Sequence, residues 1–230
     1  NAKWNDNTGI LSGDVMLIIS YEILNKYEDS KYIILSKKLI EISRLVCEGQ
    51  QSDMDFSSKS NITENEYFEM IKNKTAVLIG CSFMFGGVAA GANTFNTDTL
   101  YKIGLNLGIA FQLEDDLLDC FGDQKKFGKK IGGDILEKKK TLLYVYTSQN
   151  LSKNHREEFE KLFNSDEIDE ELKINSIKTF YIDSGAVELV KQKVKEYSNI
   201  AREKVDELEL DMSKKNEILN FSKNLLDRQI

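Results

Sequence analysis

At 230 residues with 41% hydrophobic side chains, the chain is long enough to bury a sizeable core, and we expect one domain over residues 1–230. The charged fraction of 30% and the net charge of -7 argue against general electrostatic binding to nucleic acid or to an anionic membrane. With one histidine and no closely spaced cysteines, zinc sites and histidine-dependent nucleophilic catalysis are nearly excluded. Any catalytic metal is therefore expected to be held by carboxylates.

The three cysteines and the histidine are interpreted as structural residues rather than as metal ligands or catalytic groups. Cys47, Cys81 and Cys120 are widely spaced in apolar stretches, which predicts reduced core residues of a cytoplasmic protein. His155 lies in the polar run KNHREEFE, which predicts a solvated helix face.

The pattern of apolar residues predicts an all-α fold, an antiparallel helical bundle. Proline is absent, and apolar residues repeat at spacings of three and four along most of the chain. Predicted helices cover residues 8–27, 30–49, 63–92, 98–121, 133–150, 154–163, 166–184, 185–208 and 213–228. Thr63 and Glu66 have the spacing of a capping box, which predicts a helix start at that point.

Residues 75–97 carry no charge and resemble a transmembrane span in length. The segment is rich in glycine and serine, ends in the polar run ANTFNT and directly follows Lys72 and Lys74. A buried central helix is the better interpretation, and we expect no stable membrane insertion. Its small residues, among them Gly86 and Gly87, would let another helix or a ligand approach closely.

The segment FQLEDDLLD, residues 111–119, predicts a helix with a stripe of carboxylates. Asp115 and Asp119 are one turn apart, and Gln112 is one turn before Asp115 and Asp116. No lysine or arginine lies between residues 103 and 124 to neutralise these acids. A solvated acidic face is the simple alternative, but the other faces are apolar, which favours a buried helix with its acids in a cleft. Oxygen ligands without histidine or cysteine indicate Mg²⁺ and a phosphate ester substrate.

A basic segment follows the acidic helix. Residues 122–141 hold seven lysines and three acids, and glycines at 128, 132 and 133 would let the segment close over a ligand. Beside a magnesium ion, these lysines suit the charge of a diphosphate.

Several motifs in this order resemble the trans-polyprenyl diphosphate synthases, the family of farnesyl and geranylgeranyl diphosphate synthases. FQLEDDLLD is similar to the second aspartate-rich motif, and GKKIGGDILEKKKT at residues 128–141 is similar to the lysine segment downstream of it. Three further matches precede them: ILSGD at 10–14, GQQSD at 49–53 and KTA at 74–76. The resemblance spans essentially the whole chain.

The resemblance implies a fold of antiparallel helices around a central cavity, usually in a homodimer. It implies that Mg²⁺ is bound by Asp115 and Asp116, with Asp119 acting through water. The implied diphosphate ligands are Lys74, Lys129 and Lys139, and Thr75 and Gln112 would lie beside the reacting allylic carbon. The implied reaction joins an allylic diphosphate to isopentenyl diphosphate, which lengthens the prenyl chain in a cavity that excludes water. Candidate wall residues are Phe83, Phe85, Tyr101 and Phe111.

The sequence departs from the family pattern at its beginning. The first aspartate-rich motif and the residues that hold isopentenyl diphosphate would lie upstream of Asn1, so we expect the C-terminal two-thirds to three-quarters of a synthase, incomplete for activity on its own. Two alternatives remain open: a non-catalytic regulatory subunit of a heteromeric prenyl synthase, and a terpene cyclase-like protein. The KTA, GQQSD and lysine motifs favour chain elongation over cyclisation.

Overall fold

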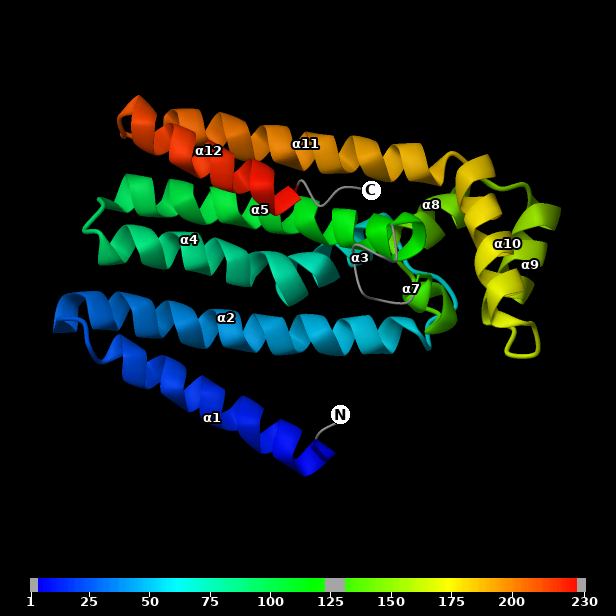
Figure 1. Ribbon diagram of the computed structural model, residues 1–230, viewed down its shortest axis with the longest axis horizontal. Helices are drawn as coiled ribbons and strands as arrows, with labels where there is room; N and C mark the ends of the chain where they lie inside the picture. The colour runs from blue at the N-terminus through cyan, green and yellow to red at the C-terminus, as the bar shows by residue number, and fades with distance from the viewer. Residues whose placement is uncertain (1–3, 123–130, 227–230) are drawn as a thin grey trace.

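The computed structural model describes residues 4–122 and 131–226, and every regular element in those ranges is helical (Figure 1). The predicted all-α fold is confirmed. The helices are α1 (Asp6–Leu24), α2 (Asp29–Phe56), α3 (Glu64–Ile71), the π-helix η1 (Lys72–Ala76), α4 (Val77–Ala89), α5 (Thr94–Phe121), α7 (Gly133–Leu136), α8 (Leu142–Asn150), α9 (Lys153–Asn164), α10 (Glu170–Asp183), α11 (Ala186–Glu207) and α12 (Met212–Leu226).

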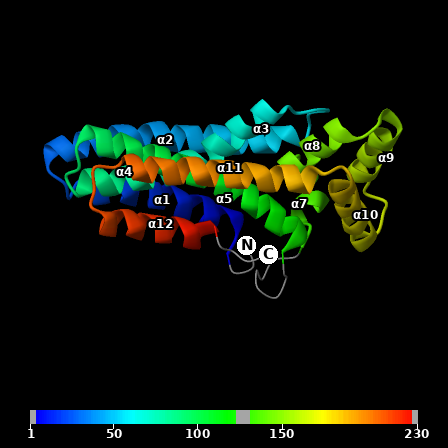
Figure 2. The same ribbon diagram turned by 90° about the horizontal axis from the view of Figure 1, so that it is seen from above.

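The long helices α2, α4, α5 and α11 lie side by side and alternate in direction (Figure 1). The shorter helices α8, α9 and α10 gather at one end, beside the C-terminal end of α5. Figure 2 shows that α1 and α12 both lie toward the same face of this layer. The C-terminal half of α5 is therefore surrounded by neighbours, and this is the part that carries the acidic stripe.

One large cluster of the core is built mainly from apolar side chains of α3, α5, α8, α9, α10 and α11. Its largest fully buried members include Tyr67, Leu113, Leu117, Phe159 and Tyr181. The start of α3 is fixed by the predicted capping box of Thr63 and Glu66. The helix α5 begins at Thr94, four residues before its predicted start, where the Asn93 side chain accepts a hydrogen bond from the Asn96 backbone.

Two predicted helices are each divided in the structure. The helix predicted over 63–92 is interrupted by η1, which widens one turn between α3 and α4. The helix predicted over 133–150 breaks after Leu136, where Lys138 adopts a positive φ of 55°. Both interruptions place lysines, Lys74 in the first and Lys139 in the second, beside the acidic end of α5.

Other boundaries and burial differ in smaller ways. α2 continues to Phe56, well past the predicted end at residue 49. Cys81 and Cys120 are buried as predicted, but Cys47 is exposed, so its prediction as a core residue was wrong. Cys47 faces solvent because α2 is buried along a narrow stripe that includes Leu35, Ile42 and Gly49, and Cys47 lies off that stripe.

The helix α1 is apolar and largely exposed. Its principal neighbour is α2, and its single buried residue is Leu24. Large apolar side chains between 42% and 69% exposed follow one another along it: Ile10, Leu11, Val15, Met16, Leu17, Ile18, Ile19 and Ile23. None of the helices in the described ranges combines the length and hydropathy that a membrane crossing needs.

Candidate functional site

A polar pocket of about 180 Å³ lies where α5, η1, the C-terminal end of α2 and the turn between α7 and α8 meet. It contains both acids and lysines. Its lining residues are Asp53, Tyr67, Met70, Ile71, Lys74, Gln112, Asp115, Asp116, Asp134, Lys139, Lys140 and Thr141. The acidic stripe of α5 therefore faces a cleft, as the sequence predicts, and the lysines on the facing elements share that cleft.

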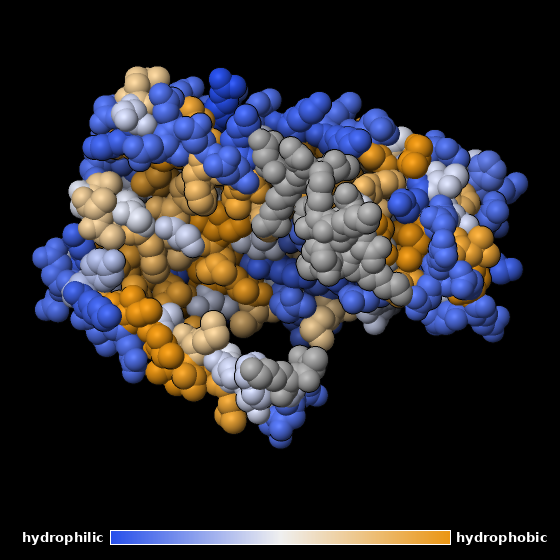
Figure 3. All heavy atoms as spheres, viewed as in Figure 1, coloured by the Kyte–Doolittle hydropathy of each residue, from blue (hydrophilic) through white to orange (hydrophobic). Residues whose placement is uncertain are grey.

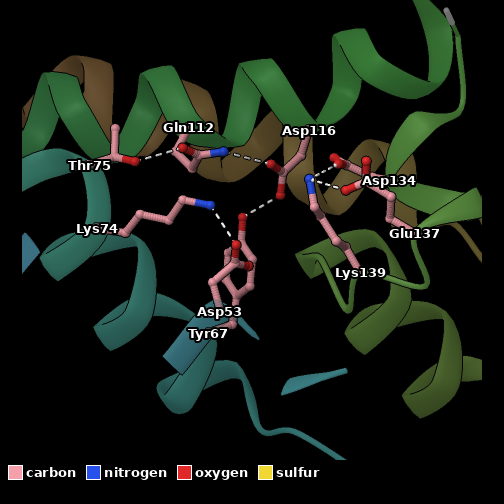
Figure 4. A network of polar contacts seen from close by, with 9 residues as sticks. All are labelled: Asp53, Tyr67, Lys74, Thr75, Gln112, Asp116, Asp134, Glu137 and Lys139. Atoms are coloured by element: carbon pink, nitrogen blue, oxygen red, sulfur yellow. Dashed lines mark hydrogen bonds and ion pairs between the residues drawn. The ribbon is translucent and has the colours of Figure 1, made fainter. Parts of the chain in front are cut away.

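A chain of hydrogen bonds crosses the pocket from α3 to η1 (Figure 4). The Tyr67 hydroxyl donates to Asp116 Oδ2 at 2.5 Å, and Gln112 Nε2 donates to Asp116 Oδ1 at 2.9 Å. The Thr75 hydroxyl in turn donates to Gln112 Oε1 at 2.7 Å. Four side chains from three elements are thus held in one fixed arrangement.

The carboxylate at the centre of this chain is electrostatically strained. Asp116 is only 5% exposed, and burial raises its pKa to about 7, assisted by the charge of Asp134. Hydrogen bonds from Tyr67 and Gln112 lower the pKa, but they do not outweigh the burial. A cation near Asp116 would relieve this strain.

Asp119 occupies a different position from Asp115 and Asp116. Its Oδ2 accepts a hydrogen bond of 2.9 Å from the Asp134 backbone N–H at the start of α7. Burial raises the pKa of Asp119 to about 6, and the charge of Asp134 acts in the same direction. Asp119 therefore anchors the turn that carries Asp134, whereas Asp115 and Asp116 line the pocket.

Each of the two predicted lysines within the described ranges is paired with an acid. Lys74 Nζ lies 2.5 Å from Asp53 Oδ2, and Lys139 Nζ lies 2.8 Å from Asp134 Oδ1 and 3.0 Å from Glu137. Burial lowers the pKa of Lys139, but its hydrogen bonds to these acids outweigh the burial and raise the pKa overall. Both ammonium groups are thus held at the edge of the pocket.

The π-helix η1 depends on two glycines of neighbouring helices. A Cβ atom on Gly49 of α2 would lie within 2.8 Å of the Lys74 Cα, and one on Gly108 of α5 would lie within 2.5 Å of the Ala76 Cα. Side chains at either position would push against the backbone of η1. The two glycines therefore let α2 and α5 close on the turn that presents Lys74 and Thr75, and such π-turns occur frequently at functional sites.

The pocket suits a magnesium ion that is shared with a phosphate ligand. Within the described ranges, no three carboxylate, thiolate or imidazole groups converge to hold a metal on their own. Mg²⁺ is typically held by one or two carboxylates together with water and substrate phosphates. Two oxygen-donor side chains on one wall, with a raised carboxyl pKa at Asp116, fit that mode of binding.

The structure brings most of the predicted site residues together. Lys74, Gln112, Asp115, Asp116 and Lys139 line the pocket, Thr75 is bonded to Gln112, and Asp119 adjoins it through Asp134. Lys129 lies outside the described residues. Sequence reasoning missed Tyr67, Asp53 and Asp134 as site residues. Tyr67 lies seven residues, or two helical turns, before Lys74, and that spacing was the available signal.

A second, apolar groove of about 740 Å³ runs between α4, α5 and α12. It is lined by Phe83, by small residues that include Gly86 and Gly87, and by Ile218 and Phe221 of α12. Apolar side chains gather on this face between α12 and α1 (Figure 3). Of the predicted wall residues, Phe83 lines this groove, whereas Phe85 and Tyr101 pack in clusters that α2 forms with α4 and α5.

The sequence model of the polyprenyl synthetase family matches residues 1–180. The chain belongs to this family. Among relatives, it is 37% identical over 160 residues to a geranylgeranyl diphosphate synthase of Saccharolobus solfataricus, covering 68% of this chain and 48% of that protein. The chain spans between about half and two thirds of the length of the first curated relatives it matches.

Solved structures of the family superpose closely. A crystal structure of a geranylgeranyl pyrophosphate synthase matches with a TM-score of 0.92 and 38% identity, over 99% of this chain and 71% of that one. A Caulobacter crescentus polyprenyl synthase, solved with calcium and isoprenyl diphosphate, matches with a TM-score of 0.88 and 25% identity, over 100% of this chain and 68% of that one. The helical arrangement is therefore that of the polyprenyl synthetases.

Proposed function

We propose that the chain belongs to a trans-prenyltransferase that condenses an allylic diphosphate with isopentenyl diphosphate to make a longer polyprenyl diphosphate. The observation that carries this proposal is the single pocket lined by Asp115 and Asp116 on one side and by Lys74 and Lys139 on the other. This combination suits a metal-bound diphosphate, and membership of the polyprenyl synthetase family supports the same reaction.

Asp115 and Asp116 would hold Mg²⁺, and Asp119 would support it through water. When bound, the ion would stabilise the negative charge of the departing diphosphate. Lys74 and Lys139 would bind the same diphosphate, and we assign a similar role to Lys129. Asp53 and Asp134 keep the first two lysines at the pocket edge, so these side chains lose little conformational freedom when the ligand arrives.

The reaction begins when the allylic C–O bond breaks and the diphosphate leaves with the electron pair. The double bond of isopentenyl diphosphate then attacks the allylic carbon, a C–C bond forms, and a proton is lost to restore a double bond. The oxygens of Thr75 and Gln112 would stabilise the positive charge through their dipoles. The apolar groove beside Phe83 would house the tail and keep water from the cation.

We further propose that two copies of the chain form a homodimer through α1. An exposed helix that is apolar around its circumference needs contacts on more than one side, and α2 is its principal neighbour. Met16, which is 69% exposed, lies in the middle of this surface. Light scattering on the full-length protein tests the pairing: a dimer that becomes monomeric on Met16→Glu supports it, and a monomeric wild type contradicts it.

We place the protein in the cytoplasm, since its three cysteines are free and one of them, Cys47, is exposed. Its net charge of -7 makes nucleic acid an unfavourable partner. The partners that remain are the two diphosphate substrates and a second copy of the chain.

The decisive experiment is incubation of the full-length protein with isopentenyl diphosphate and dimethylallyl, geranyl or farnesyl diphosphate. Reactions with and without Mg²⁺ are compared, and the products are sized by chromatography. We expect longer prenyl diphosphates only when Mg²⁺ is present. No elongation with any primer would overturn the proposed function.

A further inference from the structure

Tyr67 heads the hydrogen-bond chain that passes through Asp116 and Gln112 and ends at Thr75. It is 1% exposed, and its hydroxyl reaches Asp116, 49 residues later in the sequence, across the interface between α3 and α5. Burial and the charge of Asp116 raise the pKa of Tyr67 well above its usual value. Because a carboxylate oxygen accepts and a phenol hydroxyl donates, Tyr67 is the donor to Asp116.

The chemistry of these groups fixes the direction of every bond in the chain. When it is ionised, as it would be when it holds Mg²⁺, Asp116 can only accept hydrogen bonds, so Gln112 must turn its NH₂ group toward Asp116. The Gln112 carbonyl oxygen then faces Thr75. Because that oxygen can only accept, the Thr75 hydroxyl must donate its hydrogen bond to it. The Thr75 lone pairs consequently point away from Gln112. The dipole at Thr75 is thus set by the donor at the other end.

We propose that Tyr67 is a positioning residue that acts through Asp116 and Gln112 to fix the direction of the Thr75 hydroxyl. This inference rests on the proposed function, in which the Thr75 oxygen stabilises an allylic cation. Without the Tyr67 donor, Asp116 can rotate about its side-chain bonds, the Gln112 amide can turn over, and the Thr75 proton can point toward the reacting carbon. A positive dipole end in that place opposes the cation.

A second tyrosine in the same core supplies a matched control. The Tyr146 hydroxyl donates to Glu64 Oε1 at 2.9 Å, and Tyr146 is 7% exposed. Glu64 lies at the first position of α3, whereas Tyr67 lies one turn further along. Tyr146→Phe therefore removes a hydrogen bond of the same type, which joins α8 to α3 and lies outside the chain that reaches Thr75.

The test compares Tyr67→Phe and Tyr146→Phe in the full-length protein, by steady-state kinetics of prenyl transfer with Mg²⁺. We expect Tyr67→Phe to lower kcat about tenfold, because a misaligned group away from the chemistry has effects of this size or larger. The KM for the allylic diphosphate should stay within about twofold, because the diphosphate ligands are intact. Tyr146→Phe should leave kcat unchanged.

A double-mutant cycle separates positioning from general loosening of the core. Thr75→Val removes the end of the chain, so Tyr67→Phe should lower kcat no further in that background. Thr75→Ser keeps the hydroxyl and should keep the full dependence on Tyr67. Multiplicative losses in the Thr75→Val background, an unchanged kcat in Tyr67→Phe, or an equal loss in Tyr146→Phe would each overturn the inference. An inactive wild type would instead overturn the proposed function on which it rests.

Discussion

Two tyrosine–carboxylate hydrogen bonds hold the helix α3 in place, and they differ in how the charge is balanced. Tyr146 donates to Glu64, which also has Lys193 at 3.9 Å and a side chain that is 36% exposed. Tyr67 donates to Asp116, which is 5% exposed and has Asp134 and Asp115 among its charged neighbours. The first pair is balanced by a cation and by solvent, whereas no lysine within residues 4–122 and 131–226 forms an ion pair with Asp116 of the second pair.

The acidic end of α5 is therefore not arranged for stability alone. A buried carboxylate without a cation destabilises the folded state, and Asp116 lies on a helix whose residues Leu113 and Leu117 belong to the apolar core. The surroundings of Asp116 become favourable when a cation arrives from outside the chain. An uncompensated buried charge of this kind is typical of a binding site without its ligand, and such sites commonly lower the stability of the folded state.

The variant with the greatest predicted effect tests whether the acidic end of α5 serves turnover rather than stability. Asp115→Ala removes one wall carboxylate from the pocket, and turnover should fall on the order of a hundredfold or more, because it removes stabilisation of the departing charge. Circular dichroism should show a folded protein with little change in Tm. An unfolded variant would instead indicate a structural acidic face, and an unchanged turnover would remove Asp115 from the site.

A second variant tests how tightly the turn that carries Lys74 is held. Gly49→Ala places a methyl group against the backbone of η1, and we expect it to lower the free energy of unfolding by about 3 kcal/mol. Gly86→Ala is the matched control, since a Cβ there meets no atom within 4 Å and alanine is favoured over glycine in a helix by up to about 1 kcal/mol. Equal stability of the two variants in urea denaturation would show that the backbone of η1 moves to accommodate the methyl group at little free-energy cost.

The unbalanced charge itself predicts a pH dependence. Because the pKa of Asp116 is raised to about 7, the folded state binds its proton more tightly than the unfolded state does. The stability from that proton is present below the ordinary carboxyl range and is lost as the pH rises through about 7. In the absence of metal, Asp116→Asn should therefore stabilise the protein at pH 8, by on the order of 2 kcal/mol, with little gain near pH 4.

Urea denaturation in a chelator at the two pH values measures this gain. Glu64→Gln is the control at the balanced pair and should bring no gain at pH 8, because Lys193 and solvent already compensate Glu64. A stabilising effect of Asp116→Asn that is equal at both pH values would contradict the electrostatic explanation.

The smallest effect concerns the cap of α3. The Thr63 backbone N–H and Lys59 lower the pKa of Glu66 to about 2. Its contribution to stability is present above the ordinary carboxyl range and is lost as the pH falls toward 2. Glu66→Gln should therefore destabilise the protein slightly at pH 7 and have no effect at pH 2, as measured by thermal denaturation. A pH-independent effect would assign the stabilisation to the hydrogen bond rather than to the charge.

The sequence predicts the helical fold and the acidic wall because both depend on local spacing. Asp115, Asp116 and Gln112 fall on adjacent turns of one helix, and the apolar residues around them indicate burial. The break after Leu136 was missed because Lys138, which adopts the positive φ, is not a residue type that favours it. The turn η1 and the Tyr67 contact were missed because they arise from packing against Gly49, Gly108 and Asp116 on other helices.

The exposure of α1 affects the order in which the helices of the protein unfold locally. A helix with few buried side chains unfolds locally at little free-energy cost, and its backbone amides exchange early with solvent deuterium. Those of α5, which is buried along most of its length, should exchange only on global unfolding. In the proposed homodimer the covered amides of α1 would gain protection, so hydrogen exchange at the individual amides of α1 would report whether the chain assembles through this helix.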